Sequence, residues 1–113
     1  MNFTLEILSE AVIFIIVVSA VSLFWGNNLL LFLVLLTVWV IALRLWHTKE
    51  DVFFSMVAAV LGPFTEAICI YFGAWVYSNP SFFGIPAWLI ILWGIAGILA
   101  KRIAETIMNS MKK

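Results

Sequence analysis

Long apolar runs separated by short polar breaks organise this chain. No charged residue lies between Glu10 and Arg44, and between Asp51 and Lys101 the only one is Glu66. Apolar runs of this length are typical of membrane-spanning helices, because about 20 helical residues cross the hydrocarbon core of a bilayer. The runs predict an all-α integral membrane four-helix bundle, one transmembrane domain over residues 1–113 with a short amphipathic segment at its C-terminal end. The helices are expected at about residues 5–25, 28–46, 52–78 and 86–103.

The composition supports a membrane location. Hydrophobic residues make up 65% of the chain and charged residues 11%, whereas about a quarter of the residues in a soluble domain are charged. The net charge is zero, which gives no reason to expect a nucleic-acid partner, and the lipid bilayer is the expected surrounding. Glu6 and Glu10 stand where a signal peptide would carry basic residues, so we expect the first helix to be retained.

The basic residues predict the orientation in the membrane. With four spans, every Lys and Arg falls at one side of the bilayer, and such residues concentrate on the cytoplasmic side. We therefore expect both termini and Lys49 in the cytoplasm and Asn27 and Pro80 on the far side. The expected location is the cell membrane, in particular the cytoplasmic membrane of a prokaryote.

The third apolar run contains a proline and a face of small residues. Pro63 lacks a backbone donor and clashes with the preceding turn, so a kink is expected at Gly62 and Pro63. Membrane helices approach each other through small side chains, so this face should point into protein. In steps of three or four residues the face comprises Ser55, Ala59, Gly62, Glu66, Cys69, Gly73 and Tyr77.

Glu66 is the residue whose position most needs an explanation. In a helix over 52–78 it would lie about 20 Å from either end, close to the midplane of the membrane. An ionisable side chain at that depth is a candidate functional group, either titrating a proton or binding a cation. The alternative is a neutral, hydrogen-bonded acid that holds helices together. If Glu66 belongs to a ligand-binding or proton-binding site, the other candidate residues of that site are Thr65, Tyr71, Tyr77 and Trp93.

The other polar and aromatic residues have simpler interpretations. Trp39 and Trp93 lie inside apolar runs, where they either form an aromatic wall for a ligand or fill space, and we favour packing. Glu10 is expected in a structural ion pair at the interface, with Arg44 or with Lys101. The chain lacks the common hydrolase, metalloprotease and nucleotide-binding motifs, so we expect no metal centre and no cofactor, and we lean against an enzyme.

One stretch resembles known membrane proteins. It resembles a pattern in small uncharacterised prokaryotic multi-pass proteins and is more faintly similar to the carotenoid hydratase and related carotenoid-biosynthesis membrane proteins. This resemblance implies that Glu66 and the aromatic region from Trp75 to Trp93 form one unit. The residues that carry it are Gly62-Pro63-Phe64-Thr65-Glu66, Tyr71-Phe72-Gly73 with Trp75 and Tyr77, Gly84-Ile85-Pro86, Trp88-Leu89 and Leu92-Trp93.

Three functional hypotheses follow. The leading one is a homo-oligomeric protein that uses Glu66 for proton-linked binding or translocation of a small cation or a lipophilic compound. The second is an accessory or assembly subunit whose Glu66 pairs with a charge in a membrane protein partner. The third is an enzyme that modifies an isoprenoid lipid, with Glu66 as general acid.

Overall fold

The computed structural model describes residues 2–112 as four helices. They are α1 (Phe3–Phe24), α2 (Asn28–Leu45), α3 (Lys49–Tyr71) and α4 (Trp88–Met111). Between residues 2 and 112 the only β pairing is an isolated bridge between Phe82 and Ile85. The all-α four-helix architecture predicted from the apolar runs is confirmed.

The polar breaks in the sequence are where helices begin. Asn2, Asn27 and Thr48 each precede a helix, and each side-chain oxygen accepts a hydrogen bond from the backbone N–H three residues later, at 2.9 to 3.1 Å. This is the N-cap arrangement that satisfies one of the free donors of the first helical turn. The boundaries of α1 and α2 therefore follow closely from the sequence.

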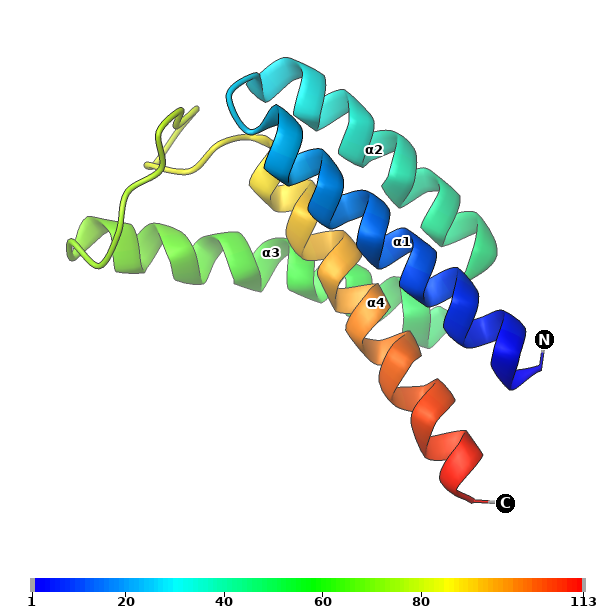
Figure 1. Cartoon of the computed structure of the whole chain (residues 1–113). Coiled ribbons are helices and arrows are strands. Elements are labelled where there is room, and N and C mark those ends of the chain that lie inside the picture. Colours follow the sequence, from blue (N-terminus) through cyan, green and yellow to red (C-terminus); the bar gives the residue numbers. More distant parts are fainter. Residues whose placement is uncertain (1, 113) are drawn as a thin grey trace.

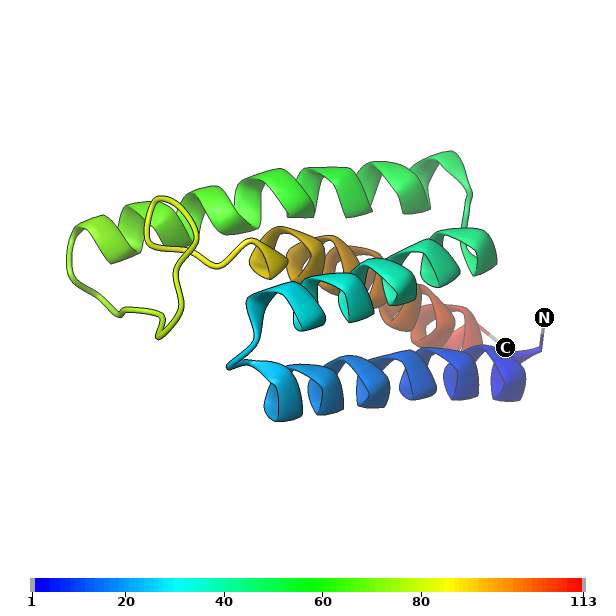
Figure 2. The ribbon, with the colours of Figure 1, turned by 90° about the horizontal axis from the view of Figure 1, so that it is seen from above.

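Helix α4 lies at the centre of the bundle and contacts each of the other three helices. Figure 1 shows both chain ends and the α2–α3 connection at one end of the molecule, with the α1–α2 turn and the 72–87 loop at the other. Figure 2 shows α3 on the opposite side of α4 from α1, and Figure 1 shows α3 running at a wide angle to α1 and α2. The fully buried core includes Leu31 and Leu35 of α2 and Ile95 and Ile98 of α4.

Helices α3 and α4 pack through small residues. A Cβ atom on Gly97 would lie 2.4 Å from the Cβ of Ala58, a distance that only glycine avoids. Ser55, Ala59 and Gly62 of the predicted small face are all buried. Small residues let two helix backbones approach closely, so this part of the predicted face works as a helix contact.

The predicted end of the third helix is wrong. Helix α3 ends at Tyr71, because Gly73 adopts a left-handed conformation with φ of 85°. The Gly73 N–H donates to the carbonyl of Ile70 and the Ala74 N–H to that of Cys69, at 3.0 and 2.9 Å. This Schellman arrangement is a common helix stop. Glu66 consequently lies about 7 Å from the end of its helix, not in the middle.

Helix α3 continues through Pro63, so the proline does not end the helix, and the expected kink there stays a prediction. Gly62 and Glu66, on either side of Pro63, both contact Trp93 of α4. The predicted end of the fourth helix is wrong. Helix α4 runs to Met111 without a break at residue 103, so the amphipathic segment is its continuation.

Three helices, α1, α2 and α3, are long and apolar enough to cross a membrane. Many of their large apolar side chains are exposed, including Leu23, Leu29 and Val60. An apolar exterior of this kind requires lipid as its solvent.

Candidate functional site

The Glu66 carboxyl group is held between two neutral hydrogen-bond donors. The Tyr77 hydroxyl donates to Oε1, and the indole Nε1 of Trp93 donates to Oε2. Glu66 itself is half-buried on α3, Trp93 comes from α4, and Tyr77 comes from the 72–87 loop. Three separate parts of the chain therefore converge on one carboxyl group.

Gly62 lets Trp93 reach this position. A Cβ atom on Gly62 would lie 2.1 Å from Cδ2 of the Trp93 ring, so the indole rests directly against the α3 backbone. Gly62 and Glu66 are four residues apart and share one face of α3. The indole ring thus lies across the glycine while its N–H points to the carboxyl group. Gly62, which is also where a kink was predicted, provides the space for the Trp93 ring.

Tyr77 reaches Glu66 because the chain turns back after Gly73. Its ring lies edge-to-face against Trp88, with ring centroids 6.2 Å apart. Trp88 Nε1 donates to Asn28 Oδ1 at 3.1 Å, and Asn28 Nδ2 donates to the carbonyl of Asn79 at 2.7 Å. These contacts fix the loop on both sides of Tyr77.

Tyr77 is a neutral donor over the physiological range. Burial raises the pKa of its hydroxyl above the usual value, and the hydrogen bond and negative charge of Glu66 raise that pKa further. The hydroxyl therefore stays protonated at neutral pH. The group that Tyr77 offers to Oε1 of Glu66 is a neutral donor and not a positive charge.

The three side chains line an apolar groove. Its volume is about 460 Å³, and it lies between α1 and α4 with Glu66 of α3 in its wall. Apart from Glu66, Tyr77 and the Trp93 indole, every lining residue is aliphatic or Phe. These are Phe14, Val17, Val18, Leu89, Leu92, Ile95, Ala96, Leu99, Ala100 and Ile103.

Two predicted members of the site lie elsewhere. The Thr65 hydroxyl is exposed and donates to the carbonyl of Leu61 in its own helix at 2.8 Å. Tyr71 is 84% exposed and packs edge-to-face against Phe72. Tyr71 lines a second, larger groove of about 750 Å³ between α3 and the 72–87 loop. Glu66 is not among the residues that line this second groove.

Trp39 serves packing, as favoured from the sequence. Its Nε1 donates to Ser55 Oγ at 2.7 Å, and Ser55 Oγ donates to the carbonyl of Gly94 at 2.7 Å. A Cβ atom on Gly94 would lie 2.6 Å from the Trp39 ring. The two inner tryptophans therefore rest on glycines of neighbouring helices, and only Trp93 touches the carboxyl group.

A second polar cluster lies at the end of the molecule that carries the chain termini. Lys101 Nζ lies 2.6 Å from Asp51 Oδ1, and Arg102 lies 3.9 Å from Glu10. Neither predicted partner of Glu10 pairs with it. Arg44 is exposed and forms no ion pair with any residue in 2–112, and Lys101 pairs with Asp51 and Glu105. Within that range the cation nearest to Glu10 is Arg102, the residue after Lys101.

No group of three or more His, Cys, Asp or Glu side chains within residues 2–112 is arranged to hold a metal ion. The chemistry available at the groove is therefore that of one carboxyl group, one phenol and one indole N–H. This set can bind a proton or a cation, and the phenol can act as donor or acceptor.

Fold and site together define an all-helical membrane protein with a hydrogen-bonded carboxyl group in the wall of an apolar groove. Comparison of the chain with protein-family models, curated proteins and solved structures finds no match.

Proposed function

We propose that the protein binds lipophilic cations in the Glu66 groove and that this binding is linked to a proton. The observation that carries the proposal is that, among residues 2–112, no basic residue lines the groove, although its lining includes a carboxyl group. Both carboxyl oxygens accept from neutral donors only. An uncompensated carboxylate attracts a cation, and the aliphatic walls favour one with a large apolar body.

The same carboxyl group can hold a proton in place of the cation. Trp93 Nε1 is only a donor, so its bond to Oε2 suits either state of the acid. The Tyr77 hydroxyl can rotate and accept, which leaves Oε1 as the place for the proton. The exchange of a proton for a cation then requires the reorientation of one hydroxyl group and no change of backbone.

Proton and cation thus compete for one site. Binding weakens as the pH falls, because a protonated Glu66 no longer attracts a positive charge. If the groove faces the two sides of the membrane in turn, this competition couples the movement of the cation to a proton moving in the opposite direction. Self-association, which we also propose, would place two such grooves in one assembly.

The proposal is tested by binding of tetraphenylphosphonium to the protein in lipid nanodiscs. A charge pair at 4 Å is worth about 4 kcal/mol at an effective dielectric constant of about 20, so loss of even part of this attraction lowers the affinity more than about tenfold. Glu66→Gln is therefore expected to lose both the affinity and its dependence on pH.

Glu50→Gln is the matched control, because Glu50 is an exposed residue at the start of α3 and lies outside the groove. It should bind the cation like the unmodified protein. Wild-type affinity of Glu66→Gln at every pH would refute the proposal and leave Glu66 as a packing residue.

A further inference from the structure

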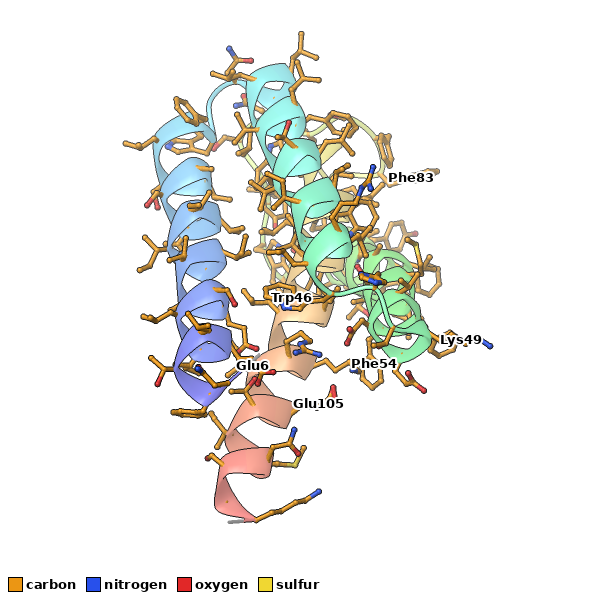
Figure 3. All side chains as sticks on the ribbon, turned by 90° about the vertical axis from the view of Figure 1, so that its right-hand side faces the viewer. Glu6, Trp46, Lys49, Phe54, Phe83 and Glu105 are labelled. Atoms are coloured by element: carbon orange, nitrogen blue, oxygen red, sulfur yellow. The ribbon has the colours of Figure 1, made fainter. Side chains whose placement is uncertain are left out.

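Glu10 is one of two fully buried acidic residues outside the groove, the other being Asp51. Glu10 lies on α1, has no exposed surface, and belongs to the polar cluster at the end with the chain termini. Figure 3 shows Glu6, Trp46 and Glu105 of this cluster close together where α1, α2 and α4 meet, with Lys49 pointing away from them. The cluster is separate from Glu66 and plays no part in the function proposed above.

The hydrogen bonds of Thr106 identify where a proton resides. Its hydroxyl oxygen lies 2.7 Å from Glu10 Oε2 and 2.8 Å from the backbone carbonyl of Arg102. A hydroxyl group has one hydrogen, and a carbonyl can only accept. If Thr106 donates to the carbonyl, the short contact with Glu10 is satisfied only when the acid donates to Thr106. A protonated Glu10 satisfies both contacts, whereas an ionised one leaves two acceptors sharing one hydrogen.

The remaining atoms around Glu10 point the same way. Its Oε1 is buried and has no hydrogen-bond partner among the residues that the structure describes, and neither has Nε of Arg102. Asp51 Oδ2 also lacks a partner, but Lys101 compensates that carboxylate at 2.6 Å. An ionised carboxylate so fully buried would need several donors, whereas a neutral acid needs fewer. The unpartnered oxygen therefore fits the neutral form better.

The nearby charges do not compensate a carboxylate at Glu10. Arg102 is shared among three acids, at 3.6 Å from Asp51 and 3.9 Å from both Glu6 and Glu10. Lys101 forms ion pairs with Asp51 and Glu105. Four carboxyl groups thus face two cations. Glu10 and Asp51 are equally buried, but Glu10 lies farther from a cation, so a proton on Glu10 reduces the excess of negative charge.

We propose that Glu10 and Thr106 form a proton-binding site, in which Glu10 carries the proton at neutral pH and donates it to the Thr106 hydroxyl. The groups that face this site are Glu6 on α1, Asp51 on α3, and Lys101, Arg102 and Glu105 on α4, while α2 contributes the uncharged Trp46. The proton is released when the pH is raised.

Infrared spectroscopy of the protein in lipid detects the proton directly, through the carbonyl stretching band of a protonated carboxyl group. The experiment uses a Glu66→Gln background, so that the groove does not contribute. We expect a band at neutral pH that disappears at alkaline pH. Glu10→Gln should remove the band, and Glu6→Gln, the matched control in the same cluster, should retain it. Absence of the band, or its persistence in Glu10→Gln, would overturn the proposal.

Substitution of Thr106 provides a second readout that does not need Glu10 to be changed. Thr106→Val keeps the shape but removes the hydroxyl, so the band should shift because the acid loses its acceptor. Thr106→Ser keeps the hydroxyl and should leave the band in place. Identical band positions in the Val and Ser variants would show that Glu10 does not donate to Thr106.

Discussion

Gly62→Ala tests how the groove is assembled, because Gly62 seats the indole of Trp93. An alanine Cβ would lie 2.1 Å from the ring, so the indole must move away from α3 and from Glu66. Alanine improves helix propensity by about 1 kcal/mol. Against this, overpacking costs about 1 to 3 kcal/mol and a lost hydrogen bond to a charged group about 1.5 to 3 kcal/mol. We expect the free energy of unfolding to fall by about 1.5 to 5 kcal/mol.

The assay is reversible unfolding in mixed micelles, followed by circular dichroism. Gly26→Ala is the matched control, because a Cβ on Gly26 would meet no atom within 4 Å. It should change the free energy of unfolding by less than about 0.5 kcal/mol.

A double-mutant cycle separates the clash from other effects of the alanine. In a Trp93→Ala background the ring is gone, so adding Gly62→Ala should be neutral or stabilising by up to about 1 kcal/mol. If Gly62→Ala is as stable as the unmodified protein, or is equally destabilising with and without Trp93, the contact does not position the indole.

Three more predictions concern the site and the membrane. Tyr77→Phe should lower the free energy of unfolding at neutral pH by about 1.5 to 3 kcal/mol. Folding raises the pKa of Tyr77, so its stabilising contribution is present below the pKa of the unfolded state, about 10, and is lost as the pH rises above that value. If the stability difference between Tyr77→Phe and the unmodified protein persists unchanged in strong alkali, the hydrogen bond is wrongly assigned. A cysteine at Pro80 in a Cys69→Ser background should be labelled only from outside the cell, and labelling only from the cytoplasm would reverse the predicted topology. Light scattering in mild detergent should give at least a dimer, and a monomer in nanodiscs at high protein concentration would count against self-association.

The sequence was sufficient to predict the helices and two partners of Glu66. Apolar runs bounded by polar breaks predicted all four helices, although α3 begins at Lys49, three residues earlier than expected. Tyr77 and Trp93 were both expected beside Glu66. The reason for Tyr77 was wrong, however: it was placed on the same helix face as Glu66, whereas it returns from a loop after Gly73 ends the helix. A glycine in an apolar run suits both a small packing face and a helix stop, and the sequence alone did not distinguish them.

The polar cluster could not be predicted for a related reason. The partner of Glu10 depends on how α4 is rotated against α1, and the sequence suggested Lys101, the neighbour of Arg102. Lys101 instead pairs with Asp51 of α3, whereas Arg102 lies 3.9 Å from Glu10. Thr106 reaches Glu10 because α4 continues beyond residue 103. Thr65 and Tyr71 were grouped with Glu66 by proximity in sequence, but their side chains emerge on other faces of α3.

Proton release on cation binding tests the central claim most directly. Tetraphenylphosphonium is added to the protein in weakly buffered nanodiscs at a pH where Glu66 is partly protonated, and the pH change is measured. We predict that the protein releases protons in proportion to the cation bound and that Glu66→Gln releases none. Saturable binding without any proton release at any pH would contradict a shared site for proton and cation on Glu66.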